Sequence, residues 1–264
     1  MRFGLLGTGP WAQQAHAPGL AAHGDVEFAG VWGRDESKAA ALAGEYGAKA
    51  YGSVDALLDD VEAVAIALPP AVQAPLALQA ARAGKHLLLD KPVALERAVE
   101  TGGWTEARVD HVGTIYDAGN PFGASAWRRE SGGLWDVGPH AVATVLPVLG
   151  KVTEVSAMVA PHDMTHLLLR HATGAVSTIT LSVDVPPAAA REEAVFAGEA
   201  GIRMVPEIAW DPIVAFGHAL DELIASAAGT LRPAMDVRFG ADVTAVLAGA
   251  EEAARSGRTV AVGG

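Results

Sequence analysis

The chain has 264 residues, half of them hydrophobic, and a formal net charge of −12. This length suits one large domain or two modest ones, and the acidic balance argues against nucleic acid or an anionic membrane as the main partner. The apolar runs are far shorter than the roughly 18 residues of a membrane-spanning helix. The absence of cysteine excludes disulfides, thiol catalysis and Cys-based metal sites. The glycines at positions 4 and 7 come too early to leave room for the apolar core of a signal peptide. We therefore expect a cytoplasmic protein with no membrane partner.

A glycine turn between an apolar strand and a helix opens the chain. Phe3–Leu6 is predicted to be the strand, and the next six residues follow the G-x-G-x-x-A form of the dinucleotide-binding fingerprint. Gly7 would make the turn, Gly9 would let the backbone approach a pyrophosphate, and Ala12 would allow close helix–strand packing. A second strand, Val26–Trp32, follows at the right distance. The pattern predicts a nucleotide site formed by Gly7, Thr8, Gly9, Pro10, Trp11 and Ala12.

The residues after the second strand indicate which dinucleotide binds. An acidic residue normally stands there and hydrogen-bonds the adenosine ribose, whereas this chain has Gly33-Arg34. Without a carboxylate nothing repels a 2′-phosphate, and Arg34 can pair with it. Asp35 is predicted to cap the next helix rather than to bind the ribose. We therefore expect NADP(H) in preference to NAD(H), with a solvated loop arginine as the alternative.

Strands and helices continue to alternate in the first hundred residues. Ala63–Leu68 is fully apolar, as in a strand buried in a parallel sheet, and ends at Leu68-Pro69. His86–Leu89 is predicted to be another buried strand and leads into Asp90-Lys91-Pro92. A lysine at the carboxyl end of a central strand stands where open α/β sheets bind ligands; without that context it would be a surface lysine. The other predicted elements are the helices Glu36–Tyr46, Val54–Asp60 and Val72–Ala83 and the strand Ala48–Tyr51.

A glycine pair, Gly132-Gly133, precedes Asp136 and His140, which stand four residues apart at the opening of the apolar run Ala141–Leu149. The glycines let the backbone turn tightly. On a helix, the spacing puts both side chains on one face. A carboxylate beside an imidazole can fix its tautomer and raise its basicity, as a proton-transferring histidine requires. The alternative is a plain helix N-terminus with an acidic first-turn residue and a solvated histidine.

The rest of the chain alternates in the manner of antiparallel strands and then turns to amphipathic helices. We expect the longer helix, Asp236–Ala254, to pack back against the N-terminal domain. His166 and His171 differ by five positions along a strand and so face opposite sides, and we expect no metal site there. The other predicted elements are the strands Trp104–Val112, Val152–Ala160, Thr165–Arg170, Ala175–Val183, Ala194–Ala197 and Gly201–Val205, and the helix Ile213–Ala227.

Three motifs in order resemble the Gfo/Idh/MocA oxidoreductases, the glucose–fructose oxidoreductase and inositol dehydrogenase family. The resemblance covers nearly the whole chain. It implies an α/β protein with an N-terminal Rossmann domain, a doubly wound parallel sheet, and a C-terminal α+β domain. The open, largely antiparallel sheet of that second domain often forms the interface of a homo-oligomer. It also implies hydride transfer between NAD(P) and a small-molecule sugar, polyol or related carbonyl compound. The motifs are Gly7-x-Gly9-x-x-Ala12, Ala83-Gly84-Lys85-His86 leading into Asp90-Lys91-Pro92, and Gly132-Gly133-x-x-Asp136-x-Gly138-x-His140 after Trp127-Arg128.

The resemblance also implies roles for single residues. Lys91 matches the family's lysine that contacts the reacting hydroxyl and the nicotinamide ribose, and Asp90 replaces the glutamate of that motif. Asp136 and His140 match the family's acid and histidine, with His140 as the acid/base. The predicted substrate contacts are Lys91, Trp127, Arg128, Asp136 and His140. The predicted cofactor contacts besides the fingerprint are Gly33, Arg34, Leu68, Pro69, Asp90 and Lys91.

The sequence departs from the family pattern at two places. Leu68-Pro69-Pro70 and Gln73 stand where the family usually has Thr-Pro-Asn and a later histidine, so a polar side chain that normally touches the cofactor is absent. After Pro92 the family continues with further Rossmann helices and a strand, whereas here Gly102-Gly103 already opens the second domain. A strand-plus-helix unit needs about thirty residues. We therefore expect a Rossmann domain of residues 1–101 without its last helix and strand, and a second domain of residues 102–264.

Two other interpretations stay open at this point. The shortened Rossmann domain and the Pro69-Pro70 loop favour a non-catalytic dinucleotide-binding sensor or regulatory partner with the same fold. The presence of Lys91, Asp136 and His140 argues against it, because a sensor does not need all three. The other interpretation is a truncated product without function.

Overall fold

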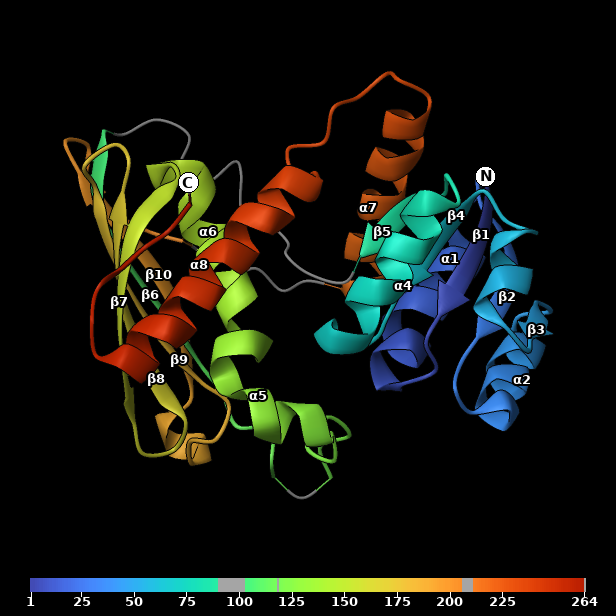
Figure 1. The fold of residues 1–264 in the computed structure, drawn as a ribbon, viewed down its shortest axis with the longest axis horizontal. Coiled ribbons are helices and arrows are strands. Elements are labelled where there is room, and N and C mark those ends of the chain that lie inside the picture. The colour runs from blue at the N-terminus through green and yellow to red at the C-terminus, as the bar shows by residue number, and fades with distance from the viewer. Residues whose placement is uncertain (90–102, 118, 206–210, 264) are drawn as a thin grey trace. The chain divides into compact units, whose positions relative to one another are not determined.

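The computed structural model describes residues 1–89, 103–117, 119–205 and 211–263 (Figure 1). The chain divides into two compact units, Met1–Asp90 with Ala209–Pro233, and Lys91–Ile208 with Ala234–Gly264. Asp90, Lys91 and the expected boundary between residues 101 and 102 lie outside the described residues. The shortening of the first domain therefore stays a prediction.

A parallel sheet of five strands forms the centre of the first unit, in the order β3-β2-β1-β4-β5. The strand order reverses between β1 and β4, and open α/β sheets bind ligands at the carboxyl ends of strands at such a switch point. This confirms the predicted Rossmann sheet. Its strands are β1 (Arg2–Leu6), β2 (Glu27–Trp32), β3 (Lys49–Tyr51), β4 (Ala63–Ile66) and β5 (His86–Leu89), with η1 (Ala12–His16), α1 (Ala17–Ala22), α2 (Glu36–Glu45), α3 (Val54–Leu58) and α4 (Pro70–Arg82) between them.

Helices cover both faces of this sheet. Phe3 and Leu5 of β1 belong to the apolar layer under α1 and α2, whereas Leu6 of β1 and Ile66 of β4 belong to the layer under α3 and α4. Burial on both faces explains why the central strands are continuous apolar runs. Among the described strands β5 lies at the edge. Its Leu89 is 38% exposed, although the sequence predicted a buried strand.

A helix from late in the chain completes the first unit. α7 (Pro212–Ala227) packs on η1, α1 and β5, with Leu220 fully buried and Phe216 and Leu223 beside it. We expected the later helix to make this contact. That helix, α8 (Val237–Ser256), packs on β7 and α6 of the second unit. The helix that covers the first sheet is therefore α7 and not the predicted helix Asp236–Ala254. An amphipathic pattern shows that a helix has an apolar face but not which sheet that face covers.

The second unit is built on a seven-stranded sheet in the order β11-β10-β6-β9-β8-β7-β12. Its pairs are antiparallel except β6 with β9, so the sheet is largely antiparallel, as predicted. The strands are β6 (Trp104–Val112), β7 (Val152–Ala160), β8 (Met164–His171), β9 (Val176–Ser182), β10 (Arg191–Gly198), β11 (Gly201–Met204) and β12 (Val260–Ala261); the helices are α5 (Ala126–Asp136), α6 (Gly138–Leu149), the short η2 (Pro187–Ala189), and α8.

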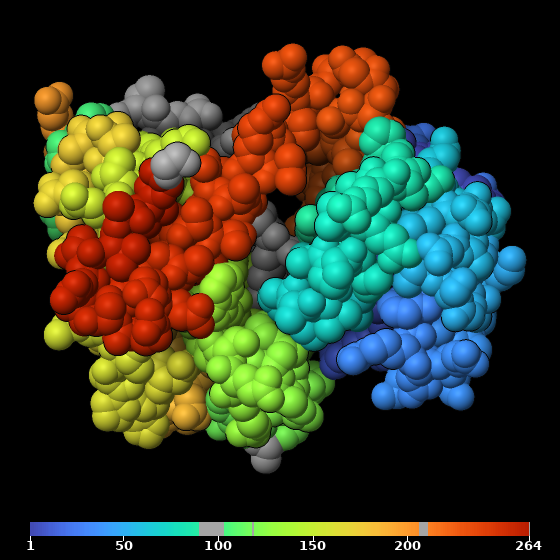
Figure 2. Space-filling model, in the orientation of Figure 1, coloured from blue at the N-terminus to red at the C-terminus, as the bar shows by residue number. Residues whose placement is uncertain are grey.

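The two faces of this sheet differ in what covers them. Helices α5, α6 and α8 lie on one side, and the outer surface of α8 faces solvent (Figures 1 and 2). Leu167, Leu169 and His171 of β8 point into the core under these helices, whereas His166 and Leu168 are exposed on the other face. The predicted opposite orientation of His166 and His171 is confirmed. None of the described helices has the length and apolar character needed to cross a membrane.

Candidate active site

Gly7 makes the sharp turn at the end of β1. Its φ is +129°, and its N–H donates to the carbonyl of Trp32 at 2.9 Å. A Cβ here would lie 2.4 Å from the carbonyl oxygen of Ala67, so the ends of β1, β2 and β4 meet at a point that only glycine fits. The predicted role of Gly7 in the turn agrees with this geometry.

Gly9 stands in open space instead. A Cβ at Gly9 would meet no atom within 4 Å. The helical stretch begins just after it, where Gln13 N–H donates to the Gly9 carbonyl at 3.1 Å and the Gln13 side chain donates to the Thr8 carbonyl at 3.0 Å. Ala12 is fully buried against the sheet. An open glycine before a helix N-terminus is the arrangement that accepts a pyrophosphate, so the residues present fit a dinucleotide.

The end of β2 packs against the fingerprint turn. A Cβ at Gly33 would lie 2.7 Å from the Thr8 side chain, and Arg34 beside it is exposed. Asp35 caps α2, because its carboxylate accepts the Lys38 N–H at 3.1 Å. The predicted cap is confirmed. The carboxylate that follows Arg34 is therefore bound to the start of a helix.

The loop after β4 offers a polar atom that the sequence did not suggest. Pro69 caps α4, and its carbonyl accepts the N–H groups of Val72 and Gln73 at 2.9 Å each. In the part of the chain that the structure describes, the Oε1 atom of Gln73 is a buried acceptor without a hydrogen-bond partner. Such an atom costs free energy unless a water or a bound group supplies a donor. Gln73 thus places a polar acceptor close to the apolar Leu68-Pro69 turn.

The glycine pair of the second unit lies at a kink inside α5. Gly132 has φ 62° and ψ −170°, and the helix resumes at Gly133. A Cβ at Gly133 would lie 2.9 Å from Cα of Ser182. The predicted tight turn is confirmed, but the helices extend further than expected. α5 reaches Asp136 and α6 already starts at Gly138.

Asp136 is a buried carboxylate held by an arginine. It is 4% exposed, and Arg128 Nε donates to its Oδ2 at 2.8 Å. The Arg128 guanidinium also lies over the rings of Trp127 and Phe122. Asp136 therefore does not fit the alternative of a solvated first-turn acid. The resemblance assigns Arg128 to the substrate, and the structure shows that it also fixes the position of Asp136.

His140 lies in the first turn of α6, half-buried, and stacks on His111 of β6. The ring centroids are 5.6 Å apart with 21° between the planes. His111 in turn lies 3.7 Å from the carboxylate of Glu192. No motif in the sequence singles out His111. His111 alternates with Ala107 and Val109, which point into the core from the same face of β6. This alternation is the signal in the sequence that could have identified it.

The predicted site residues thus form two groups, one in each unit. The fingerprint residues with Gly33, Arg34, Leu68 and Pro69 gather at the carboxyl ends of β1, β2 and β4. Trp127, Arg128, Asp136 and His140 gather around α5 and α6. Lys91 and Asp90 lie outside the described residues. Within those residues no group of three or more His, Asp or Glu side chains is arranged to hold a metal ion.

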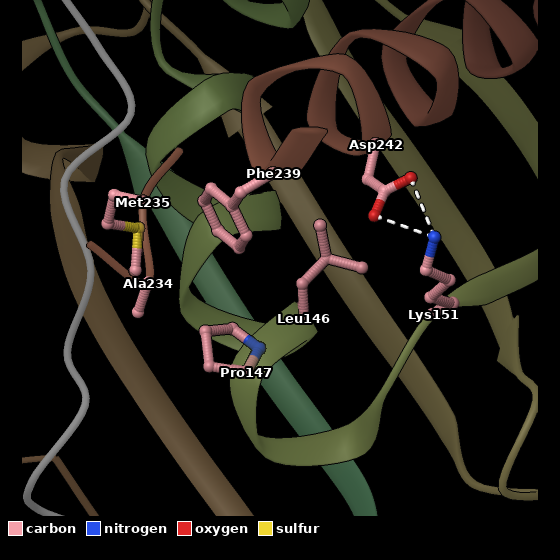
Figure 3. A pocket seen from close by; sticks show the side chains of 7 residues that line it. All are labelled: Leu146, Pro147, Lys151, Ala234, Met235, Phe239 and Asp242. Carbon is pink, nitrogen blue, oxygen red and sulfur yellow. Dashed lines mark hydrogen bonds and ion pairs between the residues drawn. The ribbon is translucent and has the colours of Figure 1, made fainter. Parts of the chain in front are cut away.

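A hollow of about 310 Å³ also lies in the second unit. The ion pair of Lys151 with Asp242, 3.1 Å long, lies on one side of it (Figure 3). Its lining is mostly apolar and includes none of the predicted site residues. The lining residues are Leu146, Pro147, Lys151, Ala234, Met235, Phe239 and Asp242.

The fold and the site define a class of proteins that join a dinucleotide-binding Rossmann unit to an α+β unit carrying an Asp–His motif. Residues 1–105 match the model of an oxidoreductase family with an NAD-binding Rossmann fold, and residues 97–202 match that of the GFO/IDH/MocA C-terminal domain. The chain belongs to the GFO/IDH/MocA family. This confirms the resemblance seen in the sequence.

Relatives with assigned names match part of the chain. The chain is 37% identical over 100 residues to dTDP-3,4-didehydro-2,6-dideoxy-alpha-D-glucose 3-reductase of Streptomyces antibioticus, over 37% of this chain and 30% of that protein. It is 41% identical over 96 residues to D-xylose 1-dehydrogenase (NADP(+)) 2 of Haloferax volcanii, over 35% of this chain and 29% of that protein. The match thus spans less than a third of either relative.

Solved structures resemble the whole chain. The WlbA dehydrogenase of Bordetella pertussis, in complex with NADH and UDP-GlcNAcA, has a TM-score of 0.82 at 20% identity. The comparison covers 100% of this chain and 98% of that one. At this identity the likeness establishes the shared fold of both units.

Proposed function

We propose that the protein is an NAD(P)-dependent oxidoreductase that transfers hydride between nicotinamide and a sugar, polyol or related hydroxy or carbonyl compound. The observation that carries the proposal is the fingerprint turn, where Gly7 is sterically required and Gly9 leaves open space. A buried Asp136 four residues before His140 supports it from the second unit. The names of the Streptomyces and Haloferax relatives, a sugar reductase and a sugar dehydrogenase, point to the same chemistry.

The proposed cofactor is NADP(H) in preference to NAD(H). The bound dinucleotide would accept or supply the hydride. Gly9 at the helix N-terminus would hold its pyrophosphate, and Gln73 Oε1 would accept a hydrogen bond from a donor elsewhere on the dinucleotide, such as a ribose hydroxyl. Arg34 is exposed beside the ribose position while Asp35 is committed to capping α2, so a 2′-phosphate meets a cation and no free carboxylate.

In the proposed mechanism His140 takes the proton of the substrate hydroxyl during oxidation and returns it during reduction. Asp136, held in place by Arg128, stabilises the imidazolium form of His140. Lys91 stabilises negative charge that develops on the reacting oxygen. Trp127 and Arg128 contribute to the substrate site beside this motif.

Turnover of sugars and polyols with NADP⁺ tests the proposal, followed by the nicotinamide absorbance. Once a substrate is found, Lys91→Ala and His140→Ala should each lower kcat by about 10²–10⁴-fold while the protein stays folded, because each removes a group that acts on the reacting oxygen. His218→Ala is the matched control, since the His218 side chain is 78% exposed on α7 and lies outside every site proposed for this chain. An unchanged kcat in either variant would remove that residue from the mechanism. NADPH binding without turnover of any substrate would support the sensor instead.

We also propose that the open face of the second sheet joins copies of the chain into a homo-oligomer. This face carries Met158, Leu168 and Ile202, which are 77%, 50% and 80% exposed. Exposed apolar side chains on one sheet face are typical of a protein interface. A native mass above the 27.0 kDa of one chain would support the assembly, and a mass equal to it would exclude it. The cytoplasmic location stays a prediction.

A further inference from the structure

The helix that carries Asp136 begins at a break in the backbone. The chain resumes its helical course at Gly133 after the kink at Gly132, and the first N–H groups of a helix have no partner within it. Asp163, from the turn between β7 and β8, accepts the Gly133 N–H with its Oδ2 atom. The Gly133 carbonyl then accepts the Val137 N–H at 3.0 Å. A carboxylate thirty positions later in the sequence thus caps the turn that contains Asp136.

The carboxylate and the glycine pair fit each other closely. A Cβ at Gly132 would lie 2.3 Å from Oδ1 of Asp163, and a Cβ at Gly133 would lie 3.1 Å from Oδ2. No other residue type at Gly132 would leave room for the carboxylate in this position. The glycine pair is therefore needed both for the turn and for the approach of Asp163.

The turn that supplies Asp163 is strained. His162 and Asp163 have φ values of 60° and 54°, and among the described residues they are the two non-glycine residues with positive φ. The Ser182 hydroxyl holds the turn by donating to the His162 carbonyl at 2.7 Å. Two successive positive φ values are usual at the centre of a tight hairpin, so the strain follows from the close connection of β7 to β8.

The charge of Asp163 does not stabilise the fold. Burial raises the pKa of its carboxyl, and the nearby Asp184 and Asp136 raise it further, against the effect of the Gly133 and Val183 peptides. A raised pKa means that the ionised carboxylate is less favourable in the folded chain than in the unfolded chain. An acid whose ionised form is disfavoured here, but which accepts the Gly133 N–H, fits a role in the site.

We propose that Asp163 is a positioning residue that fixes the helix start at Gly133 and, through it, the placement of Asp136 and His140. The inference rests on the proposed function, in which these two residues act on the substrate. Asp163 itself contacts neither substrate nor cofactor in this role.

Two substitutions that both suit a positive φ separate the carboxylate from the backbone strain. Asp163→Gly removes the acceptor and relieves the strain, whereas Asp163→Asn keeps an acceptor oxygen and tolerates the same φ. Ser177→Ala is the control, because it removes a hydrogen bond to buried His171 on the same sheet without touching the turn. The full-length protein without ligand is used. Hydrogen exchange of the Gly133 amide and the ring signals of His140, recorded by NMR at about pH 8.5 where histidine is neutral, are the readouts.

We expect Asp163→Gly to lower Gly133 protection by at least roughly tenfold and to move the His140 ring signals. Asp163→Asn should restore both, and Ser177→Ala should change neither. Unchanged Gly133 protection in Asp163→Gly would overturn the proposal. So would a loss of protection with unmoved His140 signals, or a failure of Asp163→Asn to restore both. Neither readout needs turnover. If the proposed activity is wrong, no variant will turn over a substrate, but Gly133 protection and the His140 signals can still be compared. Failure of the proposed function is therefore distinguishable from failure of this proposal.

Discussion

Glycine is needed at positions 7 and 9 for different physical reasons. Replacing Gly7 or Gly9 by alanine should distinguish an effect on stability from an effect on binding. Gly7→Ala puts a methyl group 2.4 Å from the Ala67 carbonyl at a φ of +129°, so it should lower the unfolding free energy by about 1–3 kcal/mol. Gly9→Ala meets nothing within 4 Å and should leave that stability unchanged. It should still weaken NADPH binding, because the methyl group occupies the approach of the pyrophosphate.

Thermal unfolding with and without NADPH measures both effects. Full NADPH affinity in Gly9→Ala would show that no phosphate approaches this glycine. An unchanged melting temperature in Gly7→Ala would show that the three strand ends do not meet as described.

His171 gives the second unit a dependence on pH. It is 2% exposed, its Nδ1 lies 2.7 Å from the Gly150 carbonyl, and its Nε2 lies 2.8 Å from the Ser177 hydroxyl. Burial lowers the pKa of its imidazole. The unfolded chain therefore takes up a proton that the folded chain does not, and the stabilising effect of neutral His171 is lost as pH falls below about 6.5.

Urea unfolding between about pH 5 and 8 measures this loss. His171→Gln should be less stable at neutral pH, with a shallower fall in unfolding free energy on the acid side than the wild type. His166→Gln, at an exposed site, should keep the full slope. Equal slopes in wild type and His171→Gln would contradict the assignment.

The sequence predicted which residues of the second unit carry the chemistry, but not what holds them. Asp136 and His140 follow from their spacing on one helical stretch. Their neighbours His111 and Asp163 come from β6 and from the β7–β8 turn, and Arg128 carries no sign that it pairs with Asp136. Contacts between distant segments leave no periodic trace in a single sequence.

At the level of elements, the strands of the first unit were the most predictable. Ala63–Leu68 and His86–Leu89 were expected, and β4 and β5 cover Ala63–Ile66 and His86–Leu89. β10 runs from Arg191 rather than from Ala194, because the three consecutive charged residues Arg191, Glu192 and Glu193 occupy both faces of the strand and break the alternation. The stretch around Gly132 gave no helical pattern, since a glycine pair normally ends a helix and here only kinks one.

The placement of α7 gives a direct test at this scale. Leu220 is fully buried in the layer that covers β1 and β4, so Leu220→Ala should lower the unfolding free energy of the first unit by about 2–5 kcal/mol. Val214→Ala on the same helix, where the side chain is 57% exposed, should cost less than about 0.5 kcal/mol. Chemical denaturation of the two variants makes the comparison. Similar losses in both would mean that α7 does not pack on the Rossmann sheet as described.

At the scale of the whole molecule, the two groups of site residues lie in different units. Binding of a dinucleotide to the first unit is the first requirement of the proposed activity. The sequence predicted both folds through their motifs and alternation. It could not predict that residues 209–233 return to the first unit, because that depends on which apolar faces remain uncovered. The native five-stranded sheet with Gly7, Gly9 and Gln73 is the part that a dinucleotide would stabilise.

The most direct measurement is the thermal unfolding of the purified protein with NADPH and with NADH, compared in wild type and Arg34→Ala. A dinucleotide at about a hundred times its dissociation constant should add about 2.7 kcal/mol to the unfolding free energy. We expect a larger shift with NADPH than with NADH, and a selective loss of the NADPH shift in Arg34→Ala. Equal losses for both nucleotides would contradict the role of Arg34. No shift with either, in a protein that still unfolds cooperatively, would contradict a working dinucleotide site and the oxidoreductase activity with it.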